Sequence, residues 1–322
     1  MNFFRRIYSV DYMGHKKWWF ALSGIVILVG LTSMFVRGGG NPKHGLKYGL
    51  EFKSGTRISV AFVKPASVSQ VRQIVAGQGY ADAQIQQAKQ AGASQNGYQI
   101  QTTTLDATQL TNLKTALTTA FGIATDQNGA QIYSDQTVGP TFGAQVISQS
   151  WKAGILALLL ILVYVSLRFT WKFALGAIAA EFHDGLVVIG VYSLTGREVT
   201  TATIAAVLTI LGYSLYDTVI VFDRIRENAP RMTRVRYGDM VNRSIWETLT
   251  RSINTTMITL LPVVALLLFG GTTLKDFAFA LMVGVVSGAY SSIFVASPIL
   301  TVLKEREPQY RRIIARSEDA GA

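Results

Sequence analysis

The chain has 322 residues, of which 49% are hydrophobic and only 15% are charged, and its formal net charge is +11. Soluble domains carry about 25% charged residues, so this composition excludes an ordinary soluble domain. Cysteine is absent and the histidines at positions 15, 44 and 183 are far apart, so we expect no disulfide, no metal site and no cofactor. No basic stripe with interleaved aromatic residues appears, and a nucleic-acid partner is not expected.

Six apolar segments are long enough to cross a bilayer, which takes about 20 residues each. We predict spans at residues 18–36, 149–168, 173–194, 199–222, 253–270 and 277–303. Residues 1–17 and 304–322 then form the two terminal segments, 37–148 an outer domain, and 223–250 a segment between the fourth and fifth spans. The first span is not expected to be a cleaved signal peptide, because its apolar run is long and no small-residue cleavage site follows.

The basic residues predict the orientation, because they collect on the cytoplasmic side of membrane proteins. The two short outer loops would hold one each, Arg197 and Lys275. The inner segments would hold Arg5, Arg6, Lys16, Lys17, Arg168, Lys172, Arg224, Arg226, Arg231, Arg234, Arg236, Arg243, Arg251, Lys304, Arg306, Arg311, Arg312 and Arg316. This asymmetry predicts an inner-membrane protein with both termini in the cytoplasm.

The insert at 37–148 has the pattern of a small α+β domain. Alternating apolar residues predict strands at 57–63, 83–87, 98–103 and 131–138. Helical spacing predicts helices at 67–77, with Ser67 or Ser69 as its cap, and at 107–121. The resulting order, βαββαβ, is the ferredoxin-like arrangement.

The segment at 223–250 carries apolar residues at Val241, Ile245 and Leu249, one every four residues. This spacing favours a short amphipathic helix lying in the membrane interface. An ordinary polar connector is the alternative.

Asp217 lies inside the fourth span, where a lipid-facing charge is not tolerated. At about 1.5 Å rise per residue it is roughly 9 Å from Asp223, which marks the inner end of the span. Ionisable groups at such depth are costly and usually functional, so Asp217 is a candidate proton carrier. The alternative is a structural hydrogen bond to a serine or threonine of another helix.

Other charged groups accompany it. Glu181 and Asp184 in the third span are three residues apart and share a helical face, whereas His183 points elsewhere; a proton path and a polar clamp between helices are both open. Arg251 begins the fifth span and is either a counter-charge for Asp217 or a side chain that reaches the inner surface.

The sixth span carries Gly284 and Gly288, spaced four residues apart. Small residues at this spacing allow two membrane helices to approach closely, so these glycines are predicted to be packing positions.

One long segment resembles a known family. Gly212–Asn228, which reads GYSLYDTVIVFDRIREN, resembles the fourth-span motif of the SecF family of the bacterial SecDF export complex, in the RND superfamily. Supporting matches are YGLEFKSGT at 48–56, VGPTFG at 138–143, RFTWK at 168–172, His183-Asp184, LFGG at 268–271 and YSSIFVAS at 290–297. The family's outer motif usually reads Gly-x-Asp-Phe-x-Gly-Gly-Thr, whereas this chain has Glu51 and Ser54 at two of those positions.

The resemblance implies a function and partners. A SecF-like chain would pair with SecD, associate with the SecYEG channel and use the proton-motive force to help draw the exported preprotein outward. By motif match, Asp217 would be the proton-carrying carboxylate and Arg251 its charged neighbour, while protons and membrane lipid would be its other partners.

Other classes of function are weighed against this one. A proton-coupled RND-type small-molecule exporter would usually carry both halves in one chain, whereas this chain carries one. A membrane enzyme such as an intramembrane protease would need paired catalytic groups, and the Gly-x-Gly-Asp arrangement is absent; we therefore expect a protein that is not an enzyme. A passive scaffold would not need Asp217.

Overall fold

The computed structural model describes residues 10–87, 97–232 and 235–310, so the predicted terminal segments are described only in part. The chain divides into two compact units. Tyr48–Gln149 form one unit, and the residues up to Lys47 together with those from Ser150 onward form the other.

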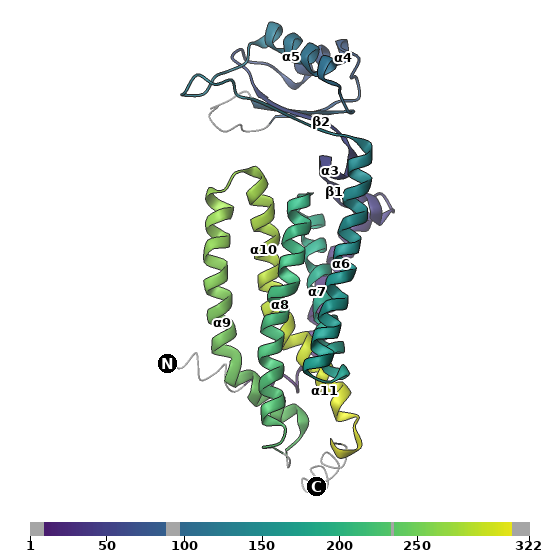
Figure 1. Ribbon diagram of the computed structural model, residues 1–322, viewed down its shortest axis with the longest axis vertical. Helices are drawn as coiled ribbons and strands as arrows, with labels where there is room; N and C mark the ends of the chain where they lie inside the picture. Colours follow the sequence, from purple (N-terminus) through teal and green to yellow (C-terminus); the bar gives the residue numbers. More distant parts are fainter. Residues whose placement is uncertain (1–9, 88–96, 233–234, 311–322) are drawn as a thin grey trace. The chain divides into compact units, whose positions relative to one another are not determined.

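Within the described ranges, six helices are long and apolar enough to cross a membrane. They are α2 (Lys16–Arg37), α6 (Pro140–Arg168), α7 (Trp171–Thr195), α8 (Thr201–Asn228), α9 (Tyr237–Phe269) and the continuous run of α10 (Thr272–Ser291), η2 (Ser292–Ala296) and α11 (Ser297–Glu305) (Figure 1). Shorter elements are η1 (Pro42–His44), β1 (Lys47–Tyr48), α3 (Leu50–Lys53) and β6 (Glu198–Val199). The predicted class, a polytopic α-helical membrane protein with six spans, is confirmed.

The segment between the fourth and fifth spans differs from the prediction. Among the described residues of this segment there is no separate interfacial helix, because α9 runs without a break from Tyr237 to Phe269. Val241 and Ile245 are fully buried and Leu249 is 8% exposed, and all three belong to the main core of the helical unit. The apolar stripe that suggested contact with lipid therefore packs against protein.

The other unit is built around a four-stranded antiparallel sheet in the order β3 (Gln84–Gln87), β4 (Gly97–Thr102), β2 (Gly55–Ala61) and β5 (Tyr133–Val138). The helices α4 (Val68–Gly77) and α5 (Ala107–Phe121) lie on one face of this sheet (Figure 1). Ser67 and Asp106 begin them with reciprocal capping bonds, which satisfy two otherwise unpaired amides at each start. The predicted βαββαβ order is present.

Glycines set the closest helix crossings in the helical unit. A Cβ atom added at Gly30 of α2 would collide with the backbone of Gly190 in α7, and the reverse also holds. On α10, a Cβ atom at Gly284 would collide with Ile210 of α8, and one at Gly288 would lie 3.0 Å from the Ser214 Cβ. The face carrying Gly284 and Gly288 therefore packs against α8, the helix that carries Asp217.

Candidate functional site

Asp217 is held in the interior of the helical unit, with 1% of its surface exposed. One turn of α8 before it lies Ser214 and directly after it Thr218, and both are also buried. The Ser252 hydroxyl of α9 donates a hydrogen bond to Asp217 Oδ1 at 3.1 Å. Oδ2 is buried and has no hydrogen-bond partner within the described part of the chain, which leaves one carboxylate oxygen able to carry a proton.

Arg251 directly precedes Ser252 in α9, so its backbone lies beside Asp217. Its guanidinium donates to the Tyr216 hydroxyl at 3.0 Å, and the arginine is exposed at the bundle surface. No ion pair joins Arg251 to Asp217 in the described ranges. The charge of Arg251 is therefore near Asp217 but separated from it in this conformation, and a small movement of α9 against α8 would change that separation.

Asp184 is the most fully satisfied carboxylate in the spans, and it has no exposed surface. Its Oδ2 accepts hydrogen bonds from Ser214 of α8 at 2.7 Å and from Ser291 of α10 at 2.8 Å. Its Oδ1 accepts one from Ser287 of α10 at 2.5 Å and lies 3.1 Å from His183 Nδ1. These five residues, called the Asp184 cluster below, join α7, α8 and α10.

The direction of the His183 side chain differs from the prediction, which pointed it away from Glu181 and Asp184. The imidazole turns to the neighbouring Asp184, because one ring nitrogen reaches the short carboxylate from the next position of the helix. The imidazole ring also stacks on Tyr290, with ring centroids 5.8 Å apart. The Tyr290 hydroxyl accepts a hydrogen bond from Ser23 and donates one to the Trp19 carbonyl, both in α2. His183 thereby links the Asp184 cluster to α2.

Glu181 shares a helical face with Asp184 but does not join its cluster. It is 2% exposed, and neither carboxylate oxygen has a hydrogen-bond partner in the described residues. A buried carboxylate without partners is costly while ionised. The pair of acidic residues predicted from the sequence therefore separates into one saturated carboxylate and one isolated carboxyl group.

Serines of α8 and α10 bind Asp184, and sequence reasoning missed them. Ser214 binds Asp184 and lies one turn from Asp217, while Thr218 and Ser292 share a hydrogen bond at 2.8 Å. Ser292 begins η2, a π-helical turn inside the sixth span, and such turns are frequent at functional sites. The four-residue spacing of Ser287 and Ser291 was the available signal, since it places two hydroxyls on one face of a helix.

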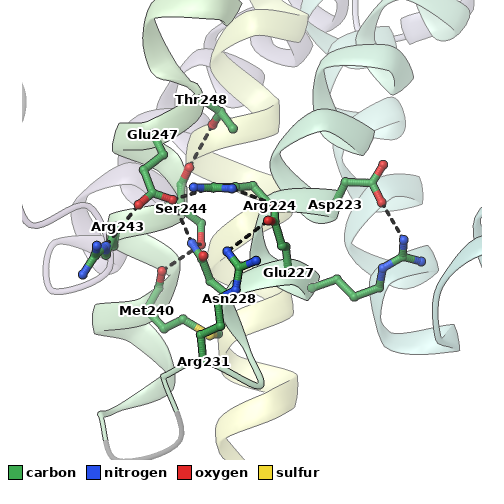
Figure 2. Close-up of polar contacts among 11 residues, drawn as sticks. Asp223, Arg224, Glu227, Asn228, Arg231, Met240, Arg243, Ser244, Glu247 and Thr248 are labelled. Carbon is green, nitrogen blue, oxygen red and sulfur yellow. Dashed lines mark hydrogen bonds and ion pairs between the residues drawn. The ribbon is translucent and has the colours of Figure 1, made fainter.

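A second polar network lies where α8 ends and α9 begins (Figure 2). Arg224 of α8 donates to Glu247 of α9 and to Glu227 of its own helix, both at 2.6 Å. Arg243 approaches Glu247 at 3.1 Å, and Asn228 donates to Glu247 at 2.9 Å. These contacts join the C-terminal end of α8 to the N-terminal part of α9. They lie on the C-terminal side of Asp217 along α8.

Comparison with known proteins identifies the family. Residues 114–306 match the model described as "Protein export membrane protein SecD/SecF, C-terminal", and residues 42–66 match the "SecD/SecF GG Motif". The chain belongs to the SecF family. The protein translocase subunit SecF of Streptomyces coelicolor is 35% identical over 97% of this chain and 82% of its own length. The SecF subunit of Pseudomonas aeruginosa is 37% identical, over 92% of each chain.

A solved structure with the same fold is also similar. The crystal structure of SecDF, a translocon-associated membrane protein from Thermus thermophilus, matches 92% of this chain with a TM-score of 0.78 and 33% identity. This SecF-family chain spans only 39% of that SecDF chain. The similarity supports a protein-export role within a SecDF complex, in a multi-pass membrane protein.

Proposed function

We propose that this chain is the SecF subunit of a SecDF complex that uses the proton-motive force to assist protein translocation through SecYEG and to complete export at the outer face. It is not an enzyme in this proposal, because its work is a change of helix packing. Both termini would lie in the cytoplasm, as the distribution of basic residues indicates.

The observation that carries the proposal is the carboxylate of Asp217. It is buried at the contact of α8 with α9, and only one of its two oxygens is hydrogen-bonded within the described residues. A buried charge is costly unless it is paired, and a proton on the free Oδ2 would neutralise it. A proton that enters along the membrane field brings about 2.3 kcal/mol per 100 mV, enough to bias two packings of the same helices.

The two sides of α8 differ in how they are held. Through Ser214 and Thr218 the helix is hydrogen-bonded to the Asp184 cluster and to Ser292. Through Asp217 it is bonded to α9 by the Ser252 hydroxyl, while the Arg251–Tyr216 bond and the Glu247 network join the same two helices at other points. Protonation of Asp217 would change its bond to Ser252 while the bonds of α8 to Asp184, Ser292 and Glu247 remain, so the part of α9 around Ser252 is expected to move.

SecD, the SecYEG channel and the emerging preprotein are the partners in this proposal. The chain spans about two fifths of the similar SecDF chain, and SecD would supply the other half of the complex in this proposal. A carboxylate supplied by SecD would complete the proton site.

A translocation assay in inverted membrane vesicles tests the proposal. Asp217→Asn keeps the size and the Ser252 contact but cannot release a proton, so the gradient-dependent late stage of preprotein movement should be lost while the complex still assembles. Asp239→Asn makes the same change at an exposed residue of α9 that pairs with Arg236, and it should translocate normally. Normal gradient-dependent translocation by the Asp217 variant would refute the proposal.

A further inference from the structure

A small cavity lies where α6, α8 and α11 end and α7 and α9 begin. Its volume is about 330 Å³, and its lining includes Arg168, Phe169, Arg226, Tyr237, Lys304 and Tyr310. Three of these side chains are cationic and come from three different helices, and no acidic residue lines the cavity among the residues that the structure describes. Such convergence of cations on one open cavity favours an anionic ligand.

The nearby carboxylates do not neutralise these cations fully. Asp223 is shared by Arg168 at 3.2 Å and Arg226 at 3.0 Å. Glu307 is shared by Lys304 at 3.1 Å and by a second lysine at 2.7 Å. Because each carboxylate serves two cations, this group of six charges retains two positive charges. Half of each arginine side chain is exposed, so their nitrogens remain accessible to a ligand.

An aromatic wall lies behind the cations. Phe169 stacks on Phe173 with ring centroids 5.2 Å apart, and the Arg226 guanidinium lies 5.1 Å from the centre of the Phe169 ring. On the other side, the rings of Tyr237 and Tyr310 meet edge to face at 4.8 Å. These contacts fix the rings, and one of them orients Arg226, so the cavity is formed before a ligand enters.

The position of the cavity identifies the source of the anion. Arg168 is the last residue of α6, and Lys304 is the last but one of α11, which places both at the level of lipid headgroups if these helices cross the membrane. Basic pockets between membrane helices at this level bind anionic headgroups. Beside the cations lie two large apolar side chains that face outward, Leu167 at 84% and Trp171 at 61% exposure, and acyl chains would cover both.

We propose that this cavity binds the phosphate of an anionic lipid headgroup, with the acyl chains of that lipid lying against Leu167 and Trp171. A free phosphate would use the same cations but would gain nothing from the two apolar side chains. The bound lipid would join the C-terminal ends of α6, α8 and α11 and thereby hold the C-terminal end of α8 in place.

Lipid titration of the detergent-solubilised full chain, in complex with its SecD partner, tests this site. The measured quantity is the concentration of phosphatidylglycerol that gives half of the maximal rise in melting temperature, each variant being compared with its own lipid-free sample. One cation near an anionic lipid is worth about 1 kcal/mol, so Arg226→Gln should weaken binding about fivefold. Asp223→Asn, which frees two arginines, should strengthen it. Arg243→Gln removes a somewhat more exposed arginine of the network in Figure 2, outside the cavity lining, and should change nothing.

Three outcomes of these titrations would overturn the proposal. If Arg226→Gln and Arg243→Gln weaken phosphatidylglycerol binding equally, general surface charge explains it and there is no site. If phosphatidylcholine binds as tightly as phosphatidylglycerol, the headgroup charge is not recognised. If inorganic phosphate raises the melting temperature as much as the lipid does, the site takes a free anion and the lipid part of the proposal is wrong.

Discussion

Removing the Ser287 hydroxyl should destabilise the helical unit far more than its size suggests. Ser287 is 5% exposed, and its hydroxyl donates at 2.5 Å to Asp184, which has no exposed surface. A hydrogen bond to a charged group contributes about 1.5–3 kcal/mol. Ser287→Ala deletes one oxygen and creates almost no cavity, so we expect a loss of about 2 kcal/mol, all of it from this bond.

A double-mutant cycle with Asp184→Asn identifies the charge as the cause. In that background the same serine donates to a neutral amide oxygen, and the bond is worth about 1 kcal/mol. The cycle should therefore give a coupling energy of roughly 1 kcal/mol between the two positions. Its measurement is the free energy of unfolding of the full chain in mixed micelles, with SDS as the denaturant and circular dichroism as the readout.

Thr209→Ala is the matched control for this cycle. Thr209 is exposed on α8, and its hydroxyl donates to the Ala205 carbonyl of its own helix, so its loss should stay within about 0.5 kcal/mol. If Ser287→Ala costs no more than this control, or if its cost is unchanged by Asp184→Asn, then Asp184 is not a buried anion held by hydroxyl donors.

Three further predictions concern other regions of the chain. Ser54→Gly should stabilise the sheet-containing unit by about 1–3 kcal/mol in thermal unfolding, because Ser54 has φ 60° and ψ 166°, a conformation that strains any residue except glycine; no gain would contradict the strain. Burial disfavours the ionised form of Asp11. Hydrogen bonds from the Gly14 amide and the Asn242 side chain outweigh this effect of burial and lower the pKa of Asp11 below its ordinary 3.8. Asp11→Asn should therefore lower the melting temperature at neutral pH, and the difference from wild type should shrink as pH falls below 3.8; a difference independent of pH would refute this. Arg251→Lys should retain part of the translocation activity and Arg251→Ala should lose most of it, whereas equal activities would leave the arginine only a surface role.

The helices and the small sheet could be predicted from the sequence, because both depend on periodic apolar residues. The helix at 67–77 and its cap Ser67 could be predicted because a cap and a 3.6-residue pattern act locally. The pattern at Val241, Ile245 and Leu249 was read correctly as an amphipathic face but assigned to lipid. A periodic stripe shows that a face is buried, and only the tertiary fold decides what buries it.

The candidate site was predictable residue by residue but not as an arrangement. Asp217 and Asp184 were found because a carboxylate in an apolar span is conspicuous. The hydrogen bond of Asp217 to a serine of another helix, Ser252, was one of its two predicted alternatives. The surroundings of Asp184 were not predicted, since they depend on Ser214 of α8, 30 residues away, and on Ser287 of α10, more than 100 residues away. Hydroxyls of this kind are common in membrane helices, and only the fold shows which of them face a charge.

Proton movement through the complex tests the central claim about Asp217 most directly. Vesicles containing SecYEG, SecD and this chain would be loaded with a pH-sensitive dye, supplied with an engaged preprotein and given an imposed membrane potential. The account predicts a dye response that depends on the potential and disappears in Asp217→Asn, while Asp239→Asn keeps it. An undiminished response in the Asp217 variant would contradict the assignment of the proton to this carboxylate.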